Sequence, residues 1–384
     1  MKQRVLILGA KDCAAHAAEA AGRAGLEAVV ATSVPNEPEA MADAARTNGA
    51  EGIYCADEAH VEAAAAASSK LGFPCLSEYA ARLLHSKEAL RSALARETGL
   101  NPRYGIAGSL AETEQIIRRL GLPAVVKPLE GAWGQGALIV RDIADAPLAF
   151  TRAVKHASSG RVLLEPYLPG HEYRVICHRS QGRWSTLMVY SNVPAEHDHL
   201  FDRALVAPVR VAGPLRDKLR ASVRTVMRVM GGGHGLVVLE FMVSGEGLHL
   251  VELSRISQSW ALATELFPAI SGIDLLEVDV ASALGKPFDT KPRFKVCAAL
   301  WWLTARSGVV SAVHGEEKVR AVPGVVRLQL NAQPGTVLGH QVDVPSRDAV
   351  GHVLVTARSP RRALEKAQYA SEYVRIDTRA ALGQ

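Results

Sequence analysis

The stretch from Leu236 to Arg255, LVVLEFMVSGEGLHLVELSR, reads as two strand-forming runs joined by a turn that contains glycine. Each run carries one acid, Glu240 in the first and Glu252 in the second. A three-residue turn over Gly245–Gly247 would place the two acids directly opposite each other, with Cβ atoms about 4.5–5.5 Å apart. An even-numbered turn would instead place them on opposite faces of the hairpin.

Two carboxylates this close repel each other unless a cation lies between them. Mg²⁺ is typically bound through one or two carboxylates plus substrate phosphates, so Glu240 and Glu252 are candidate metal ligands. Ser254 points to the same face as Glu252 and offers a third oxygen. An exposed hairpin with two solvated acids would show the same local pattern, because charged side chains are mostly exposed.

The composition is that of a globular protein with several cores. The length of 384 residues favours two or three domains. The fractions of hydrophobic residues (48%) and charged residues (22%) are ordinary for globular proteins. The net charge of +5 is spread along the chain without a long basic run, so small anions such as nucleotides are favoured over nucleic acid. No signal peptide is visible, and no stretch approaches about 18 continuous apolar residues. We expect a soluble, cytoplasmic protein that binds neither nucleic acid nor membrane.

Neither the cysteines nor the histidines predict a zinc site. The five cysteines are scattered, odd in number and without CxxC spacing, which is typical of reduced core residues. His197 and His199 flank Asp198, but no further ligand stands nearby, so a structural or substrate-contacting role is favoured over metal binding.

Strands alternate with helical patterns over the N-terminal part of the chain, which predicts a parallel α/β domain over residues 1–84. The glycine fingerprint of dinucleotide-binding domains is absent, because the next glycine after Gly9 is Gly22. The three apolar runs are Arg4–Ala10, Glu27–Ala31 and Gly52–Ala56.

Residues 85–121 are expected to form connecting helices. Ser86 fits the N-cap of one of them, and Lys87 then lies in the first turn, where the helix dipole disfavours a positive charge. An anionic partner for Lys87 is therefore expected, with a solvated lysine as the alternative.

A glycine-rich segment, LPAVVKPLEGAWGQGALIVRD, lies between two predicted strands at Leu122–Asp142. Glycines let backbone N–H groups approach phosphate oxygens, and Lys127 at the end of the first strand adds a positive charge. The segment is a candidate triphosphate loop, with an ordinary hairpin turn as the alternative. Its glycines are Gly131, Gly134 and Gly136.

The segment VLLEPYLPGHEYRV at Val162–Val175 leaves one strand at Glu165, bends at a proline and enters a second strand that carries Glu172. Backbone groups at Pro166, Tyr167 and Leu168 are suited to hold an adenine edge, and Glu172 is suited to accept from ribose hydroxyls. A hairpin with surface acids would look the same.

The order and spacing of these motifs resembles the ATP-grasp superfamily over nearly the whole chain. The resemblance implies a mixed α/β and α+β fold with an N-terminal parallel domain, a small glycine-loop lid over residues 122–168, and a large antiparallel-sheet domain over residues 169–384. It also implies ATP and Mg²⁺, with Mn²⁺ as an alternative ion. By motif, the resemblance assigns the phosphates to Lys87, Lys127 and the glycine loop, adenine to Glu165, Pro166, Tyr167 and Leu168, ribose to Glu172, and the metal to Glu240, Glu252 and Ser254.

One departure from the family pattern affects the site. The family usually shows Glu-x-Asn-x-Arg at the second acid, whereas this chain reads Glu252-Leu253-Ser254-Arg255-Ile256. Serine replaces the asparagine, and the arginine stands one place early. We therefore expect metal binding to depend on the two glutamates and water. The candidate catalytic residues are Arg255 and Lys127.

The C-terminal region resembles the closing subdomain of ATP-grasp ligases related to biotin carboxylase, including the L-amino-acid ligases. Ser307–Thr336 and Gly351–Ala367 read as strands with Pro-Gly turns that end in a helix, and no biotin-carrier lysine motif is visible. Members of this branch are commonly homodimers, which implies a homodimer here. Candidate substrate-lining residues lie in Ser254–Glu265 and around Trp301, Trp302 and Arg306, although core packing accounts equally well for the tryptophans.

The activity implied is an ATP-dependent ligation of a small carboxylate, an amino acid in the first instance, to an amine through an acyl phosphate, with release of ADP and phosphate. Two alternatives remain open. One is a carboxylase that phosphorylates bicarbonate, and the other is a non-catalytic regulatory module that binds ATP, for which Ser254 is the main sequence argument.

Overall fold

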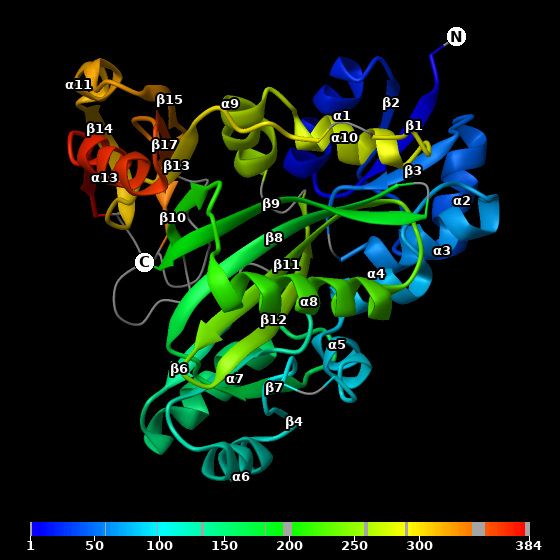
Figure 1. Cartoon of the computed structure of the whole chain (residues 1–384), viewed down its shortest axis with the longest axis horizontal. Helices are drawn as coiled ribbons and strands as arrows, with labels where there is room; N and C mark the ends of the chain where they lie inside the picture. The colour runs from blue at the N-terminus through cyan, green and yellow to red at the C-terminus, as the bar shows by residue number, and fades with distance from the viewer. Residues whose placement is uncertain are drawn as a thin grey trace.

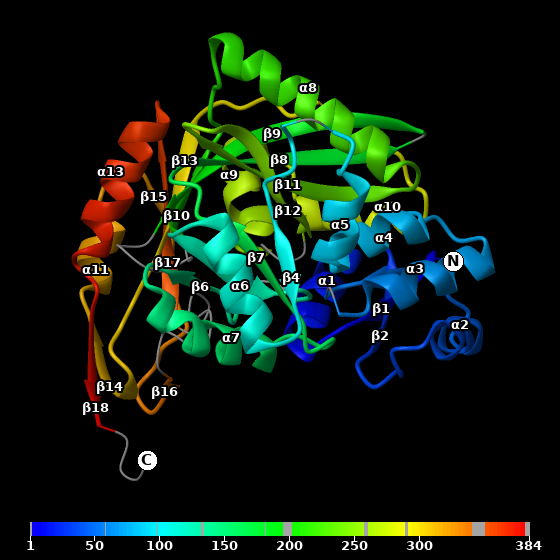
Figure 2. The same ribbon diagram turned by 90° about the horizontal axis from the view of Figure 1, so that it is seen from below.

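The computed structural model describes residues 2–57, 59–97, 99–131, 134–180, 182–194, 202–256, 260–288, 291–339 and 350–380. These residues form four β-sheets with helices packed between and around them (Figure 1). The N-terminal domain and the C-terminal strands lie at opposite ends of the largest sheet, as Figures 1 and 2 both show.

The N-terminal sheet is parallel, in the order β2-β1-β3, as the alternating pattern predicts. The buried face of its first helix is made of small side chains, Ala14, Ala17, Ala20 and Ala21, which allow a close approach to the neighbouring elements. The elements are β1 (Arg4–Leu8), α1 (Lys11–Arg23), β2 (Glu27–Ala31), α2 (Pro38–Thr47), β3 (Gly52–Cys55) and α3 (Val61–Leu71).

Two short helices, α4 (Glu78–His85) and α5 (Lys87–Ala93), lead out of this domain. Ser86 caps α5 as predicted, since its Oγ accepts a hydrogen bond from the backbone N–H of Ala89 at 3.2 Å. Lys87 is therefore fixed in the first turn of α5, pointing toward the sheets that follow.

The small sheet is antiparallel in the order β4-β7-β5-β6. Its first strand and first helix come from residues 105–120, within the stretch expected to contain only connecting helices, because β4 pairs with β7. The elements are β4 (Gly105–Ala107), α6 (Leu110–Leu120), β5 (Ala124–Pro128), β6 (Leu138–Val140), η1 (Ile143–Asp145), α7 (Ala146–Lys155) and β7 (Val162–Pro166). The domain boundaries themselves stay a prediction.

The large sheet runs β12-β11-β8-β9-β10-β13-β17-β15 with antiparallel neighbours throughout. Its strands are β8 (Gly170–Ser180), β9 (Arg183–Pro194), β10 (Asp202–Ala207), β11 (Gly235–Ser244), β12 (Gly247–Arg255), β13 (Cys297–Trp302), β15 (Val325–Leu330) and β17 (Gly351–Ala357). Strand residues of alternate parity enter two different cores, as expected for a sheet covered on both faces.

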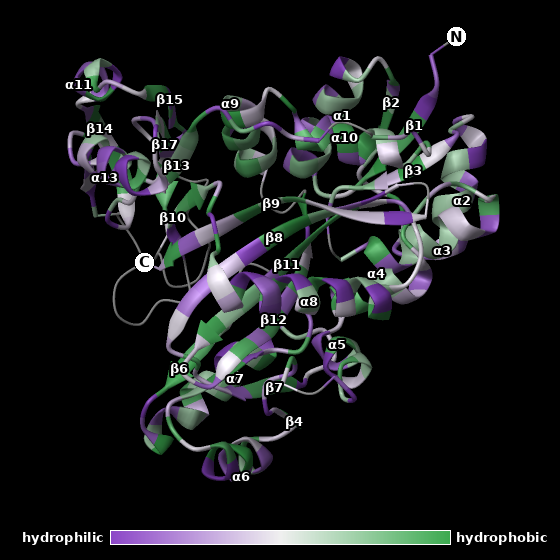
Figure 3. Ribbon diagram, viewed as in Figure 1, coloured by the Kyte–Doolittle hydropathy of each residue, from purple (hydrophilic) through white to green (hydrophobic). Residues whose placement is uncertain are grey.

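One face of the large sheet packs against α8 (Gly213–Met230), with α4 and α5 alongside. Hydrophilic and hydrophobic segments both appear along α8 in Figure 3, since the helix buries one side and presents arginines on the other. The opposite face packs against α1, η3 (Leu262–Leu266), α9 (Phe267–Ser271) and α10 (Leu275–Ser282).

The C-terminal part adds a third antiparallel sheet, β16-β14-β18, and closes around its own core. Its elements are β14 (Gly308–His314), α11 (Glu316–Ala321), β16 (Val337–Leu338), α13 (Pro360–Ser371) and β18 (Arg375–Arg379). None of the helices in the described ranges is long and apolar enough to span a membrane.

Candidate active site

The two central acids face each other as the sequence predicts, by a route that differs from the predicted one. Glu240 in β11 pairs with Glu252 in β12. The turn, however, contains only Gly245 and Glu246, because Ser244 pairs with Gly247. An irregularity in the pairing leaves Val251 as an extra residue, and this bulge restores the alignment of the acids.

Each acid has its own cation. Lys87 Nζ lies 3.1 Å from Glu252 Oε1, so the anionic partner predicted for this lysine is present. Arg174 lies opposite Glu240 in the neighbouring strand β8 and places its guanidinium 3.1 Å from Glu240 Oε2. Ser254 Oγ donates to Glu240 Oε1 at 3.1 Å, so its hydroxyl lies on the acid face as expected.

A second ionic group lies beside the first. Glu165 in β7 is buried between Lys127 Nζ at 2.8 Å and Arg91 Nε at 2.5 Å. Arg91, with no exposed side-chain surface, also donates to the carbonyl oxygens of Leu250 at 3.0 Å and Val251 at 2.7 Å. Arg91 therefore connects the small sheet to the bulge that aligns Glu252.

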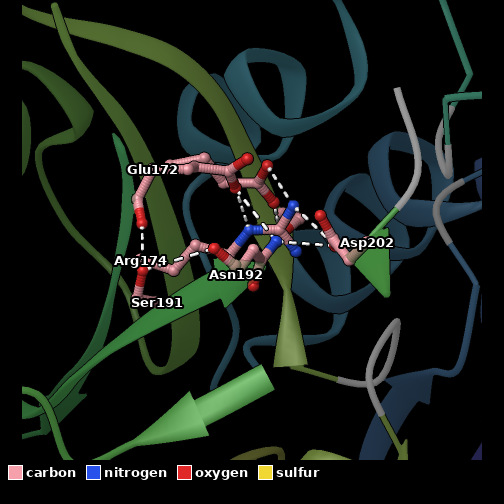
Figure 4. A network of polar contacts seen from close by, with 7 residues as sticks. Glu172, Arg174, Ser191, Asn192 and Asp202 are labelled. Atoms are coloured by element: carbon pink, nitrogen blue, oxygen red, sulfur yellow. Dashed lines mark hydrogen bonds and ion pairs between the residues drawn. The ribbon is translucent and has the colours of Figure 1, made fainter. Parts of the chain in front are cut away.

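Figure 4 shows the third group, which surrounds Arg174. The guanidinium contacts Glu172 and lies 3.5 Å from Asp202 Oδ2. Asn192 Nδ2 donates to both acids, at 3.1 Å to Glu172 and 2.6 Å to Asp202. The side chain of Glu172, predicted to bind ribose, is thus oriented by Arg174 on β8 and Asn192 on β9.

This concentration of charge separates the pKa values of the paired acids. Burial, together with the neighbouring Glu172, Glu252 and Asp202, raises the pKa of Glu240 to about 8 despite Arg174. Burial also opposes ionisation of Glu252, but Lys87 and Lys127 outweigh it and lower its pKa. Burial likewise opposes ionisation of Glu165, whose pKa Arg91 and Lys127 nevertheless lower to about 2.

The paired acids suit a hard divalent cation. Two opposed carboxylates and a hydroxyl provide oxygen donors only, which Mg²⁺ and Mn²⁺ accept. Within the described ranges, no group of three or more His, Cys, Asp and Glu side chains is arranged to hold a metal by itself. A cation held by Glu240 and Glu252 would take its further oxygen ligands from a bound phosphate or water.

The glycine loop begins next to the acids. The carbonyl oxygen of Gly131 accepts from Lys87 Nζ at 2.6 Å. Gly131, Gly134 and Gly136 all have positive φ, between 68° and 104°, which disfavours any side chain. A Cβ on Gly136 would also lie 3.0 Å from the side chains of Pro128 and His156. Roles in phosphate binding for these glycines stay predictions.

The predicted adenine hinge, Glu165 to Leu168, joins β7 of the small sheet to β8 of the large one. Its backbone is partly engaged: Pro166 pairs with Ala124, and Tyr167 N–H donates to the Pro123 carbonyl at 2.9 Å. Leu168 is buried. Adenine binding by this segment stays a prediction.

The structure does not bring Arg255 to the acid pair. Arg255 is the last residue of β12, and its side chain extends to α10 and β3 instead of to Glu240 and Glu252. Its guanidinium lies 3.0 Å from Asp279 Oδ2 and over the ring of Tyr54 at 5.2 Å. Tyr54 Oη and the backbone N–H of Leu236 also donate to Asp279. These contacts are structural, and the catalytic role predicted for Arg255 has no support from this placement. His197 and His199 lie outside the described residues.

The predicted substrate-lining residues divide between two cores. Trp302 packs on the face of the large sheet that carries the acids, whereas Trp301 packs toward the C-terminal core. On the acid face, His352 lies between the rings of Trp302 at 5.4 Å and Trp260 at 5.9 Å. Its Nε2 lies 2.7 Å from Glu265 Oε2.

Sequence reasoning missed several residues of the site. Arg91 follows Lys87 by four positions and therefore shares its helix face, a local signal that was available. Arg174 follows Glu172 by two positions and shares its strand face. Asn192 and Asp202 come from other strands and carry no local signal.

Comparison with known proteins agrees with this geometry. Residues 93–258 match the family model of the ATP-grasp domain, and residues 301–379 match that of the L-amino acid ligase C-terminal domain 2. Among curated proteins, the formate-dependent phosphoribosylglycinamide formyltransferase of Nitratidesulfovibrio vulgaris strain Miyazaki F is 25% identical over 97% of this chain and 96% of its own. An uncharacterized protein of Sinorhizobium fredii is 25% identical over 75% of this chain, and the match spans 60% of that longer protein.

Solved structures share the fold over nearly the full length. The L-amino acid ligase of Bacillus licheniformis superposes with a TM-score of 0.81 at 19% identity, covering 98% of this chain and 99% of its own. The N5-carboxyaminoimidazole ribonucleotide synthetase of Thermotoga maritima gives 0.74 at 18% identity, covering 98% and 100%. The biotin carboxylase domain of Hydrogenobacter thermophilus 2-oxoglutarate carboxylase, a complex that contains MgADP, gives 0.71 at 18%, covering 98% and 91%.

The sheets and the matched family models define an ATP-grasp fold. The chain belongs to the ATP-grasp superfamily, as the sequence motifs predicted. Within the superfamily it is a carbon–nitrogen ligase of the carboxylate–amine type, and residues 301–379 match the C-terminal domain 2 of L-amino acid ligases.

Proposed function

We propose that this ligase activates an amino acid as its acyl phosphate and joins it to the amine of a second amino acid. The observation that carries the proposal is the Glu240–Glu252 pair, with Lys87 and Lys127 beside Glu252, on the face of the sheet that also carries Trp302. The match of residues 301–379 to an L-amino acid ligase domain supports amino acids as the substrate class.

The residues of the chain would act mainly by holding and neutralising charge. Lys87 and Lys127, each paired with a glutamate in the structure, would contact the phosphate oxygens of ATP. Glu240 and Glu252 would hold Mg²⁺ with Ser254 nearby, and the ion would supply a positive charge at the phosphates. Glu172, oriented by Arg174 and Asn192, would accept hydrogen bonds from ribose.

The chemistry needs no side-chain nucleophile. A carboxylate oxygen of the first substrate attacks the γ-phosphorus, and the bond to the β-phosphate oxygen breaks as ADP leaves. The neutral amine of the second substrate then attacks the acyl carbon, phosphate leaves with the former carboxylate oxygen, and the amine loses a proton as the amide forms. The side chains described above would align the reacting groups and stabilise the charge that develops on the phosphoryl oxygens.

The substrate pocket is proposed to lie between the acid pair and the aromatic group of Trp260, Trp302 and His352. Glu265 joins this group through His352 and is also 3.0 Å from Arg327 Nε. Aromatic walls with a few charged groups suit the side chain and the charged ends of an amino acid.

A homodimer, implied by the resemblance, stays a prediction that sedimentation analysis would test.

The direct test is phosphate release from ATP and Mg²⁺ with each of the twenty amino acids, singly and in pairs, followed by mass spectrometry. A pair that releases phosphate and gives a product equal to the two masses minus water would establish the ligase and identify its substrates. Formate and bicarbonate belong in the same panel, because curated relatives include formate-dependent transferases and structural relatives include a biotin carboxylase domain. Phosphate release with formate or bicarbonate alone, without amino acids, would show that this acid, and not an amino acid, is the substrate that the enzyme phosphorylates.

A matched pair of variants tests the metal assignment. Glu240→Gln should abolish substrate-dependent ADP release while the fold is retained, whereas Glu246→Gln, on the exposed turn of the same hairpin, should behave as wild type. Near-normal turnover in Glu240→Gln would refute the metal role. Tight ATP binding without product under any substrate mixture would favour a regulatory ATP-binding module.

A further inference from the structure

A groove lies on the face of the large sheet opposite the acids, where α8 ends. Its lining comes from β8, β9 and α8 and includes Arg179, Trp184, Val223, Arg224, Met227 and Arg228. Cys177, Val223 and Met227 belong to the core on the α8 side, whereas the core on the other face holds Trp302 and the substrate-side aromatics. The thickness of the sheet therefore separates this groove from the proposed ATP site.

The groove has an apolar floor and a firmly held aromatic wall. Cys177, Val223 and Met227 are buried beneath it. Trp184 lies opposite Arg179 across the β8–β9 pair, and its indole N–H donates to the Gly231 carbonyl at the end of α8 at 3.3 Å. The Arg179 guanidinium covers the Trp184 ring at 5.4 Å.

The charged side chains that line the groove are all positive. Three arginines line it, and the lining residues include no acid. Arg228 pairs with Glu97 at 2.9 Å. Arg179 and Arg224 make no ion pair within the described part of the chain, and Arg179 Nε is buried without an acceptor there. A buried donor without an acceptor costs free energy that a bound anion would recover.

The size of the groove suits a small molecule. Its volume is about 460 Å³, which is within the range of ligand sites. Guanidinium groups recognise carboxylates and phosphates in a two-point geometry. An apolar floor beside such groups is complementary to a ligand that carries a hydrocarbon body and one anionic end.

We infer that this groove is a second ligand site, separate from the ATP site, for a small anion with an apolar body. Its carboxylate or phosphate contacts the arginines, and its body lies against Trp184, Val223 and Met227. The inference does not depend on the proposed ligase activity, because no residue of the groove contacts the acids or the lysines of that site.

Calorimetric titration of the full chain with 3-phenylpropionate and with phenyl phosphate tests this site. Saturating MgADP is present throughout so that the nucleotide site is filled. Both probes carry the same ring, so the acid that binds more tightly identifies carboxylate or phosphate as the preferred group. We expect saturable binding of at least one acid, and binding of 3-phenylpropan-1-ol about tenfold weaker or absent, since it lacks the charge.

Two variants of α8 locate the binding. Arg224→Glu reverses a charge that lines the groove, and Arg220→Glu makes the same change one turn earlier at an exposed position outside it. We expect Arg224→Glu to weaken binding at least about tenfold and Arg220→Glu to leave it within about twofold. Absence of saturable binding by both acids, equal losses in the two variants, unchanged binding in Arg224→Glu or equal affinity for the alcohol would each overturn the inference.

Discussion

Glu240 and Glu252 stand opposite each other although the turn between their strands has only two residues, because Val251 bulges out of the β11–β12 ladder. Strand β12 is the edge of the large sheet, so carbonyl groups on its outer side have no neighbouring strand. Arg91 takes the place of a neighbouring strand here, because its guanidinium donates hydrogen bonds to the carbonyl oxygens of Leu250 and Val251. The alignment of the acid pair is therefore supported by a buried guanidinium from α5.

Replacing Arg91 with methionine should destabilise the protein strongly. The substitution leaves the buried Glu165 with Lys127 as its remaining cation and leaves two carbonyls without this donor. Removing one partner of a buried ion pair costs about 3–5 kcal/mol, which urea denaturation would measure. Arg118→Met is the control, since its ion pair with Glu114 on α6 is exposed and is expected to contribute less than about 1 kcal/mol. Equal denaturation midpoints for the two variants would show that Arg91 is dispensable.

Nucleotide-dependent Mg²⁺ binding should release a proton from Glu240. The pKa of about 8 means that this carboxyl is mostly protonated at pH 7 in the metal-free protein, and a metal ligand must be ionised. MgADP titrations in buffers of different ionisation enthalpy should therefore show proton release approaching one at pH 7 and near zero at pH 9.5. Glu240→Gln should remove the release, whereas Glu246→Gln should retain it. A release that persists in Glu240→Gln would assign the proton to another group.

The same carboxyl should make the metal-free protein less stable as the pH rises. Its folded-state pKa lies above the ordinary value of 4.5, so the native state binds the proton more tightly than the unfolded state between these values. The resulting stabilisation is fully present below about pH 4.5 and is lost as the pH rises through about 8. Other groups titrate in this range, so the informative quantity is the difference between wild type and Glu240→Gln. We expect that difference to change by an amount on the order of a few kcal/mol between pH 5 and pH 9 in urea denaturation; an unchanged difference would contradict the raised pKa.

Much of this fold was predictable because local patterns determine it. The short apolar runs before helical segments gave the parallel N-terminal sheet, and Ser86 marked the start of α5. The pairing of Glu240 with Glu252 was predicted from an odd-numbered turn that is not present. Val251 sits inside a continuous apolar run, and nothing in its neighbourhood distinguishes a bulged residue from a paired one.

The remaining parts of the site depend on contacts between distant segments. Arg174 is bound by acids from β8, β10 and β11, and only Glu172 is close to it in the sequence. Arg255 was predicted from its position near the second acid, but its side chain is held by Asp279 on α10, a residue 24 positions further along the chain. Motif spacing therefore identified the acids and lysines, while the orientation of each side chain depended on strand parity and on partners far along the chain.

Lys127 should be required for turnover far more than its neighbours on the small sheet. Its ammonium lies 2.8 Å from Glu165, and its charge also lowers the pKa of Glu252. Lys127→Met would remove a charge from the proposed phosphate site, and loss of one preorganised electrostatic contact typically lowers kcat about 100-fold to 1000-fold. Lys155→Met, the same change at an exposed position on α7, is the control and should keep normal phosphate release. The rates are to be compared at saturating ATP, so that a change in KM alone is distinguished from a loss of kcat. If Lys127→Met raised only the KM for ATP, the lysine would bind the ground state and transition state equally, and its assignment as a catalytic residue would be withdrawn.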